Sequence, residues 1–247
     1  MNRIDLEGLN PEVARRFGPF IDEVLKHHGR EVQSIHIVGS AVTPDFNEKT
    51  SDINSLIILK RMSIDFIEAI APLGKRYGRK RISAPLIMTE EYISNSLDVF
   101  PIEFHDFKLI HKTILGDDIL SNLEIESEHL RLQCERDIKT RLIGLRQGYI
   151  SAAMDKRLIT ELLIRSFTGC IPLFRAILRL IGKEPPLARL DVIKVMQEVF
   201  SDSTVLEDML LLKNNRLKPT GDELSHLFRQ YYAAIEKISD RLDELKT

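Results

Sequence analysis

In the first half of the chain, apolar residues gather in short runs that alternate with amphipathic segments. Four of these short apolar runs are typical of strands. They span residues 32–38, 56–60, 82–88 and 101–107. Apolar residues at three- and four-residue steps predict helices from Pro11 to Gly29 and from Ser63 to Gly78, and Thr89 begins a shorter one. This alternation predicts a mixed sheet with flanking helices, and Pro85 places the third strand at an edge.

From residue 125 onward the strand pattern is absent and helical spacing takes over. Leu130, Cys134 and Ile138 recur at four-residue steps with charges between them. A second long helix is expected from Asp155 to Ile181, bent near Pro172. Three further helices are expected at residues 190–200, 203–213 and 220–245. The expected fold class is therefore α+β, with a mixed β-sheet and flanking helices in residues 1–122 and an all-α helical bundle in residues 123–247.

The composition of the 247 residues is that of a soluble globular protein, with 43% hydrophobic and 29% charged residues. The formal net charge of −2 gives no overall basic field for nucleic acid. No apolar run approaches the roughly 20 residues that a membrane span needs, and the charged N-terminal segment lacks the apolar core of a signal peptide. Cys134 and Cys170 have neither metal-ligand spacing nor a disulfide pattern. We therefore expect a cytoplasmic protein with two buried thiols.

Three polar features accompany the expected strands. Gly39 and Ser40 follow the first strand, where glycine lets the backbone approach a phosphate and the hydroxyl can bond its oxygens. Asp52 and Asn54 precede the second strand, and alternation sends both side chains to one side as oxygen ligands for Mg²⁺. Glu103 alternates with apolar neighbours in the expected fourth strand. Each feature alone also has a plain structural explanation: a turn, an Asx turn before a strand, and a solvent-facing glutamate.

Together, these features resemble the DNA polymerase β-like nucleotidyltransferase superfamily. In that superfamily a Gly-Ser turn is followed by a carboxylate-x-carboxylate pair and by a third carboxylate on a later strand, and the resemblance covers roughly residues 30 to 110. It implies a nucleotide-binding set and a catalytic, metal-binding set. These are Gly39, Ser40 and Ser51 for the nucleotide, and Asp52, Asn54 and Glu103 for catalysis and the metal. The helical half resembles the bundle that follows the catalytic domain in bacterial aminoglycoside nucleotidyltransferases.

The resemblance implies a Mg²⁺-dependent nucleotidyl transfer. An acceptor hydroxyl on a small molecule or protein attacks the α-phosphate of a nucleoside triphosphate such as ATP, and pyrophosphate leaves. Two Mg²⁺ ions would stabilise the attacking and leaving oxygens. The acceptor, the nucleotide preference and the general base stay open, as does assembly with a second copy or another protein.

The chain departs from the superfamily pattern at Asn54, which offers a metal one carbonyl oxygen but no charge. At an effective dielectric constant near 20, a missing unit charge about 4 Å away is worth on the order of 4 kcal/mol per unit of opposing charge, before screening. We therefore expect weaker metal occupancy. A second class of function stays open for this reason: a catalytically weakened nucleotide-binding or regulatory partner module, antitoxin-like in its role.

A basic segment from Lys75 to Arg81 is the feature that favours nucleic acid. It fits equally well a solvated turn or an edge that steers a triphosphate. Nucleic acid is therefore not the favoured partner, and a steep salt dependence of binding would be its signature. A ribonuclease in the helical half is not favoured either, because neither His129 nor His226 follows an arginine at the spacing of helical ribonuclease toxins.

Overall fold

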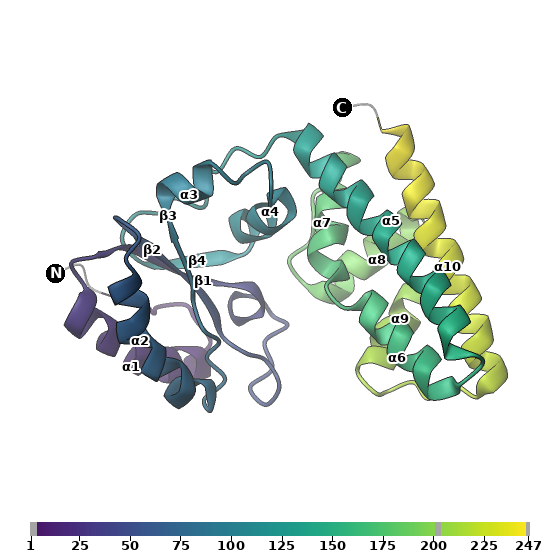
Figure 1. Ribbon diagram of the computed structural model, residues 1–247, viewed down its shortest axis with the longest axis horizontal. Helices are drawn as coiled ribbons and strands as arrows, with labels where there is room; N and C mark the ends of the chain where they lie inside the picture. The colour runs from purple at the N-terminus through teal and green to yellow at the C-terminus, as the bar shows by residue number, and fades with distance from the viewer. Residues whose placement is uncertain (1–3, 201–203, 246–247) are drawn as a thin grey trace. The chain divides into compact units, whose positions relative to one another are not determined.

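The computed structural model describes residues 4–200 and 204–245. The chain divides into two compact units, here called the sheet unit (Met1–Asp98 with Glu103–Glu124) and the helical unit (Val99–Ile102 with Ile125–Thr247). The expected α+β class is confirmed, with a small mixed sheet and its helices followed by an all-helical part (Figure 1). The expected domain boundary between residues 122 and 123 stays a prediction.

The sheet unit is built on four strands in the described part of the chain. They are β1 (Val32–Val38), β2 (Asn54–Leu59), β3 (Leu86–Thr89) and β4 (His111–Leu115), in the order β3-β2-β1-β4. β1 pairs antiparallel with β2 and β4, whereas β2 and β3 are parallel. The sheet is therefore mixed, and the third strand lies at an edge, as Pro85 predicts.

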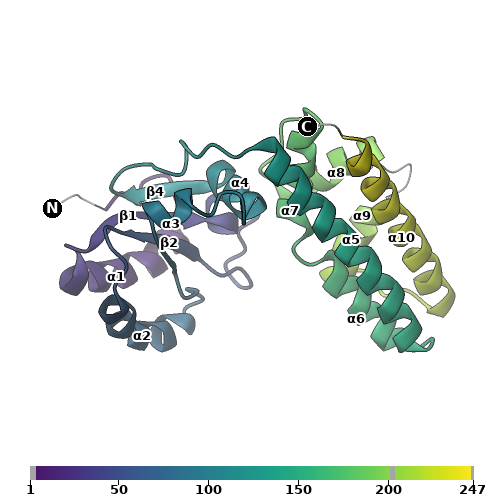
Figure 2. The same cartoon turned by 45° about the horizontal axis from the view of Figure 1, so that its top comes forward.

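One face of the sheet carries the core of the sheet unit. Ile35, Ile37 and Ile57 belong to this core and are completely buried. The helices α1 (Pro11–His28) and α2 (Ile64–Gly78) contribute to the same core, and both lie on one side of the sheet (Figures 1 and 2). Alternate residues of the strands point to the opposite face, which positions the candidate site.

This opposite face is called the motif face. Its members in β1, β2 and β4 follow from the strand register and are His36, Val38, Asn54, Leu56, His111 and Thr113. The short helices α3 (Glu90–Ser94) and α4 (Pro101–Leu109) lie on the side of the sheet away from α1 and α2 (Figure 1). α3 begins as predicted, since the Thr89 hydroxyl accepts the Tyr92 N–H at 3.1 Å.

The expected strand at residues 101–107 is wrong, because this segment is the helix α4. Pro101 occupies the first helical position, where its missing N–H costs nothing. Ile102, Phe104 and His105 are buried, and these positions fit one face of a helix as well as a strand pattern. Over so short a run, periodicity alone does not distinguish the two. The strand that completes the sheet is β4, which the sequence pattern did not predict.

The helical unit contains six helices among the described residues. They are α5 (Ser127–Ala152), α6 (Lys156–Phe167), α7 (Cys170–Leu180), α8 (Arg189–Phe200), α9 (Val205–Lys213) and α10 (Gly221–Glu244). The expected single helix from Asp155 to Ile181 is two helices, because Gly169 takes a φ of +76° between them and Pro172 falls in the first turn of α7. The expected helix start at Ser203 lies outside the described residues. α5 and α10 run side by side (Figures 1 and 2).

None of the helices in the described ranges combines the length and the apolar character that crossing a membrane requires.

Candidate functional site

The Gly39–Ser40 pair lies where β1 ends, in a backbone conformation that favours glycine. The φ of Gly39 is +72°, in the left-handed region, and a short 3-10 helix, η1 (Gly39–Val42), follows it. A Cβ atom at this position would lie 3.8 Å from Nδ2 of Asn54. Ala41 is buried in the core of the sheet unit and anchors the turn. The turn therefore stands directly beside the start of β2.

Asp52 and Asn54 project to the same side of the chain. Ile53 lies between them and is completely buried in the core, so alternation turns both polar neighbours to the motif face. Asn54 pairs with Val38, the residue before Gly39. Both polar side chains are exposed. The structure thus brings the Asp52 carboxylate, the Asn54 amide and the Gly39–Ser40 turn to one edge of the motif face. These residues are called the motif edge.

Arg81 also belongs to the motif edge, although the sequence indicates it only as part of a basic segment. Its guanidinium donates to Asp52 Oδ1 at 3.5 Å and to the Thr50 carbonyl oxygen at 3.3 Å. Its own carbonyl oxygen accepts the Ile53 N–H at 2.8 Å, and its φ of +57° is uncommon for a residue with a side chain. Because 29 residues separate Arg81 from Asp52, no local spacing could have paired them.

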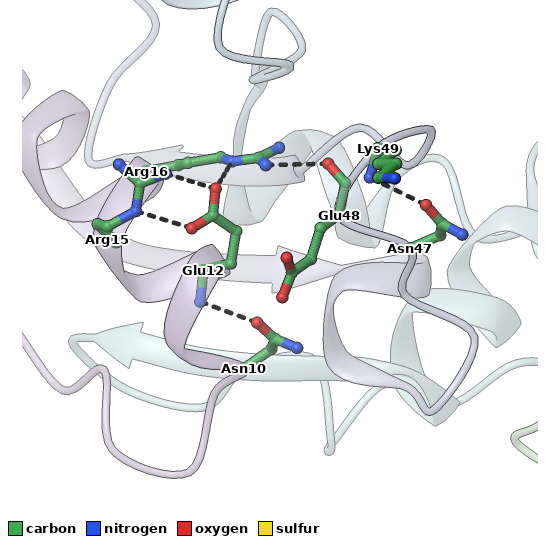
Figure 3. Close-up of polar contacts among 7 residues, drawn as sticks. All are labelled: Asn10, Glu12, Arg15, Arg16, Asn47, Glu48 and Lys49. Carbon is green, nitrogen blue, oxygen red and sulfur yellow. Dashed lines mark hydrogen bonds and ion pairs between the residues drawn. The ribbon is translucent and has the colours of Figure 1, made fainter.

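The loop that leads from η1 to Asp52 is tied to the start of α1 (Figure 3). The Arg16 guanidinium donates to the Glu48 carbonyl oxygen at 2.9 Å, and it also donates to Glu12 Oε1 at 2.5 Å. Hydrogen bonds from Arg15 and Arg16 lower the pKa of Glu12 to about 2, so this carboxylate stays ionised and keeps Arg16 oriented. α1 therefore fixes the position of the loop.

Within that loop, Asn47 and Ser51 close a tight turn. Asn47 Oδ1 accepts the Lys49 N–H at 2.9 Å and the Thr50 N–H at 3.2 Å (Figure 3 draws the first). The Ser51 hydroxyl accepts the Asn47 N–H at 3.0 Å. Ser51 thus has a structural partner inside the loop, and its contact with a nucleotide stays a prediction.

Glu103 lies on a helix and not on a strand, which corrects the sequence prediction. It is exposed in the first turn of α4, between the buried Ile102 and Phe104. The side chain does leave the core, but the strand alternation that assigned its direction does not apply. Its role as a third metal ligand stays a proposal.

The residues of the motif edge offer oxygen donors of the kind that bind Mg²⁺. Mg²⁺ commonly binds through one or two carboxylates together with substrate phosphates. Asp52 provides one carboxylate, and Asn54 provides one neutral oxygen. The flanking strands add no carboxylate to this face, because β1 presents His36 and Val38, and β3 has the sequence Leu-Ile-Met-Thr. The expected pair of ions therefore stays a prediction, as does the third carboxylate.

No protein-family model matches the sequence, and no curated protein matches it. Among solved structures, the chain is similar to spectinomycin adenyltransferase AAD(9) from Enterococcus faecialis, crystallised with ATP and spectinomycin. The TM-score is 0.55 at 14% sequence identity, over 93% of this chain and 99% of that chain. At this identity the likeness establishes the fold, and it spans both units. The chain has the nucleotidyltransferase fold with a helical C-terminal domain.

Proposed function

We propose that the chain is a nucleotidyltransferase-like protein that binds a nucleoside triphosphate at the motif edge. The proposed reaction transfers the nucleoside monophosphate to an acceptor hydroxyl on a small molecule or a protein. One observation carries the proposal: a left-handed glycine turn stands beside Asn54, which follows Asp52 by two residues along the chain. The likeness to an adenyltransferase crystallised with ATP and spectinomycin supports a nucleotide and a small acceptor as the substrates to test first.

Each residue of the motif edge has a distinct part in this proposal. The backbone at Gly39 and the hydroxyl of Ser40 bind phosphate oxygens, because the glycine leaves room for close approach. Asp52 and the Asn54 carbonyl oxygen hold a Mg²⁺ ion that arrives with the triphosphate. That ion supplies positive charge for the departing pyrophosphate. Arg81 offers a second, fixed positive charge at the same place.

A second function is favoured by the departures from the superfamily pattern. Asn54 is neutral, Glu103 stands on a helix, and the Arg81 guanidinium contacts the single strand-edge carboxylate of Asp52. A site with these features can hold a nucleoside triphosphate and still transfer its nucleoside monophosphate poorly. The alternative is therefore a nucleotide-binding regulatory module that acts through a protein partner.

Binding and turnover measurements separate the two functions. Nucleoside triphosphates with Mg²⁺ should raise the melting temperature, because a ligand that binds the native state stabilises it. Pyrophosphate release in the presence of aminocyclitol and aminoglycoside acceptors identifies a transferase. Binding without release favours the regulatory module. The proposed site is refuted by the absence of any stabilisation, or by stabilisation that Asp52→Ala leaves unchanged in a variant that still folds.

A further inference from the structure

Three side chains of the sheet unit that the proposed function does not use form a cluster near the Gly39 turn. His36 comes from β1, His111 from the first position of β4, and Asp118 from the loop after β4. One nitrogen of each imidazole and one oxygen of the carboxylate lie within 4.8 Å of one another. His111 pairs with Val38, the last residue before the turn. The backbone of the sheet therefore positions the two histidines, and the loop after β4 adds the carboxylate.

The hydrogen bonds of His111 leave its Nε2 atom facing an acceptor. Nδ1 lies 2.7 Å from the Phe107 carbonyl oxygen, which can only accept, so Nδ1 carries a proton. Nε2 lies 2.8 Å from Asp118 Oδ1. A neutral imidazole protonated at Nδ1 would therefore turn a lone pair toward a carboxylate. This repulsion is relieved either by a second proton on the ring or by a cation held between the two groups.

Asp118 is held in one orientation by Ser121. Ser121 supplies both its hydroxyl, at 2.7 Å from Oδ2, and its N–H, at 3.2 Å from Oδ1. The Asp118 side chain is 45% exposed, whereas that of His111 is 7% exposed. The cluster is thus closed on the protein side and accessible to solvent through the carboxylate.

His36 supplies a completely buried imidazole. The Ser34 and Thr113 hydroxyls lie 2.9 and 2.8 Å from its two nitrogens. One of these hydroxyls must donate to the nitrogen that carries no proton, and an ion bound to that nitrogen would take the place of this hydrogen bond.

We propose that His36, His111 and Asp118 form a binding site for a divalent transition-metal ion such as Zn²⁺. Two imidazoles and one carboxylate are typical Zn²⁺ ligands, and three protein ligands leave a position for water. The contact of Nδ1 with a carbonyl oxygen is the support that metal-binding histidines commonly have. Ligand atoms about 2 Å from an ion lie within roughly 4 Å of one another. The ligand atoms of this cluster therefore need to approach one another by only about 1 Å.

The nitrogen ligands distinguish this site from the motif edge, where the donors are oxygens suited to Mg²⁺. The proposal does not rest on nucleotide binding or transfer. Asp52→Asn should therefore leave Zn²⁺ affinity unchanged, which separates failure of this proposal from failure of the proposed function.

The test is calorimetric titration of the chelator-treated full chain with Zn²⁺, paired with melting curves. We expect one Zn²⁺ per chain and a higher melting temperature, which millimolar Mg²⁺ does not reproduce. Asp118→Asn should weaken Zn²⁺ binding by at least about tenfold, since altering even supporting residues of a metal site typically costs 10- to 100-fold. Asp117→Asn, an exposed neighbour with the same charge change, is the matched control and should bind as the wild type does.

A second metal, Co²⁺, tests the buried ligand His111. Co²⁺ has visible absorption bands that depend on its ligands, and His111→Gln should abolish the bands seen with the wild type. If His111→Gln fails to fold, the half-exposed Asp118 still provides the test. Cys134 and Cys170 are completely buried and do not compete in the native state. Absence of stoichiometric Zn²⁺ binding overturns the proposal, and so does equal affinity of the wild type and Asp118→Asn.

Discussion

At the scale of single residues, Asn54 decides how much charge the motif edge can offer a metal. Its amide lies beside Gly39 and projects to the same face as Asp52. Asn54→Asp adds a second carboxylate there. Without metal the two carboxylates repel, although Arg81 offsets part of the repulsion, so we expect a small loss of stability. With Mg²⁺ and ATP we expect binding about tenfold tighter, or about 1.4 kcal/mol, a fraction of the unscreened charge interaction.

The measurement for Asn54→Asp is a set of paired melting curves with EDTA and with Mg²⁺ plus ATP. Gln147→Glu makes the same amide-to-carboxylate change at an exposed position of α5 and is the control. A metal-dependent gain no larger than that of the wild type would show that the site works with a neutral residue, or that it has no metal to recruit.

The conformation of Gly39 leads to a second prediction at the residue scale. A Cβ at this position meets only Asn54, at an ordinary contact distance of 3.8 Å, so the cost of Gly39→Ala is one of backbone strain. We expect a loss of about 1–2 kcal/mol in the free energy of unfolding, measured with urea. Gly74→Ala is the control, because that glycine lies inside α2 with open space around it, and alanine there should stabilise by roughly 0.5–1 kcal/mol. Equal effects of the two substitutions would contradict the left-handed turn.

At the scale of elements, features that depend on neighbouring residues could be predicted from the sequence. Pairing between segments that are distant in the sequence could not. Asn10 caps α1 and Ser63 caps α2, because each side chain accepts a hydrogen bond from an N–H two or three residues ahead. The Gly39 turn and the shared direction of Asp52 and Asn54 also follow from local rules. The assignment of Glu103 to a strand failed because seven residues do not separate a helical face from a strand pattern.

The link between α1 and the loop before Asp52 gives a prediction at the element scale. Arg15 and Arg16 both bind Glu12, but only Arg16 is also hydrogen-bonded to the Glu48 carbonyl oxygen (Figure 3). Arg16→Ala should therefore lower the free energy of unfolding by on the order of 1.5 kcal/mol, as loss of a hydrogen bond to a charged group does. It should also speed proteolytic cleavage within residues 43–51. Arg15→Ala, whose side chain is 72% exposed, should leave the loop as resistant as in the wild type.

The proteolysis result discriminates between a local and a global effect. Faster cleavage in Arg16→Ala, at a site within residues 43–51, supports a loop held by α1. Cleavage that is equally fast in Arg15→Ala would show that the shared partner Glu12, and not the bond to the loop, matters.

At the scale of the whole molecule, the chain contains two cores, one in each compact unit. Ile57 is completely buried in the sheet unit, and Ile235 is completely buried in the helical unit. Truncating either to alanine removes the same apolar volume and should cost about 2–5 kcal/mol in the unit that contains it. Because each unit buries its own core, calorimetric unfolding of the full chain should depart from a single two-state transition. Ile57→Ala should lower mainly the unfolding temperature of the sheet unit, and Ile235→Ala mainly that of the helical unit.

Hydrogen exchange, measured on the full chain, assigns each unfolding transition to its unit. Mg²⁺ with ATP should protect the sheet unit in the wild type and in Ile235→Ala, if the nucleotide binds at the motif edge. A single transition that both variants lower equally would instead mean that the two cores unfold as one cooperative structure.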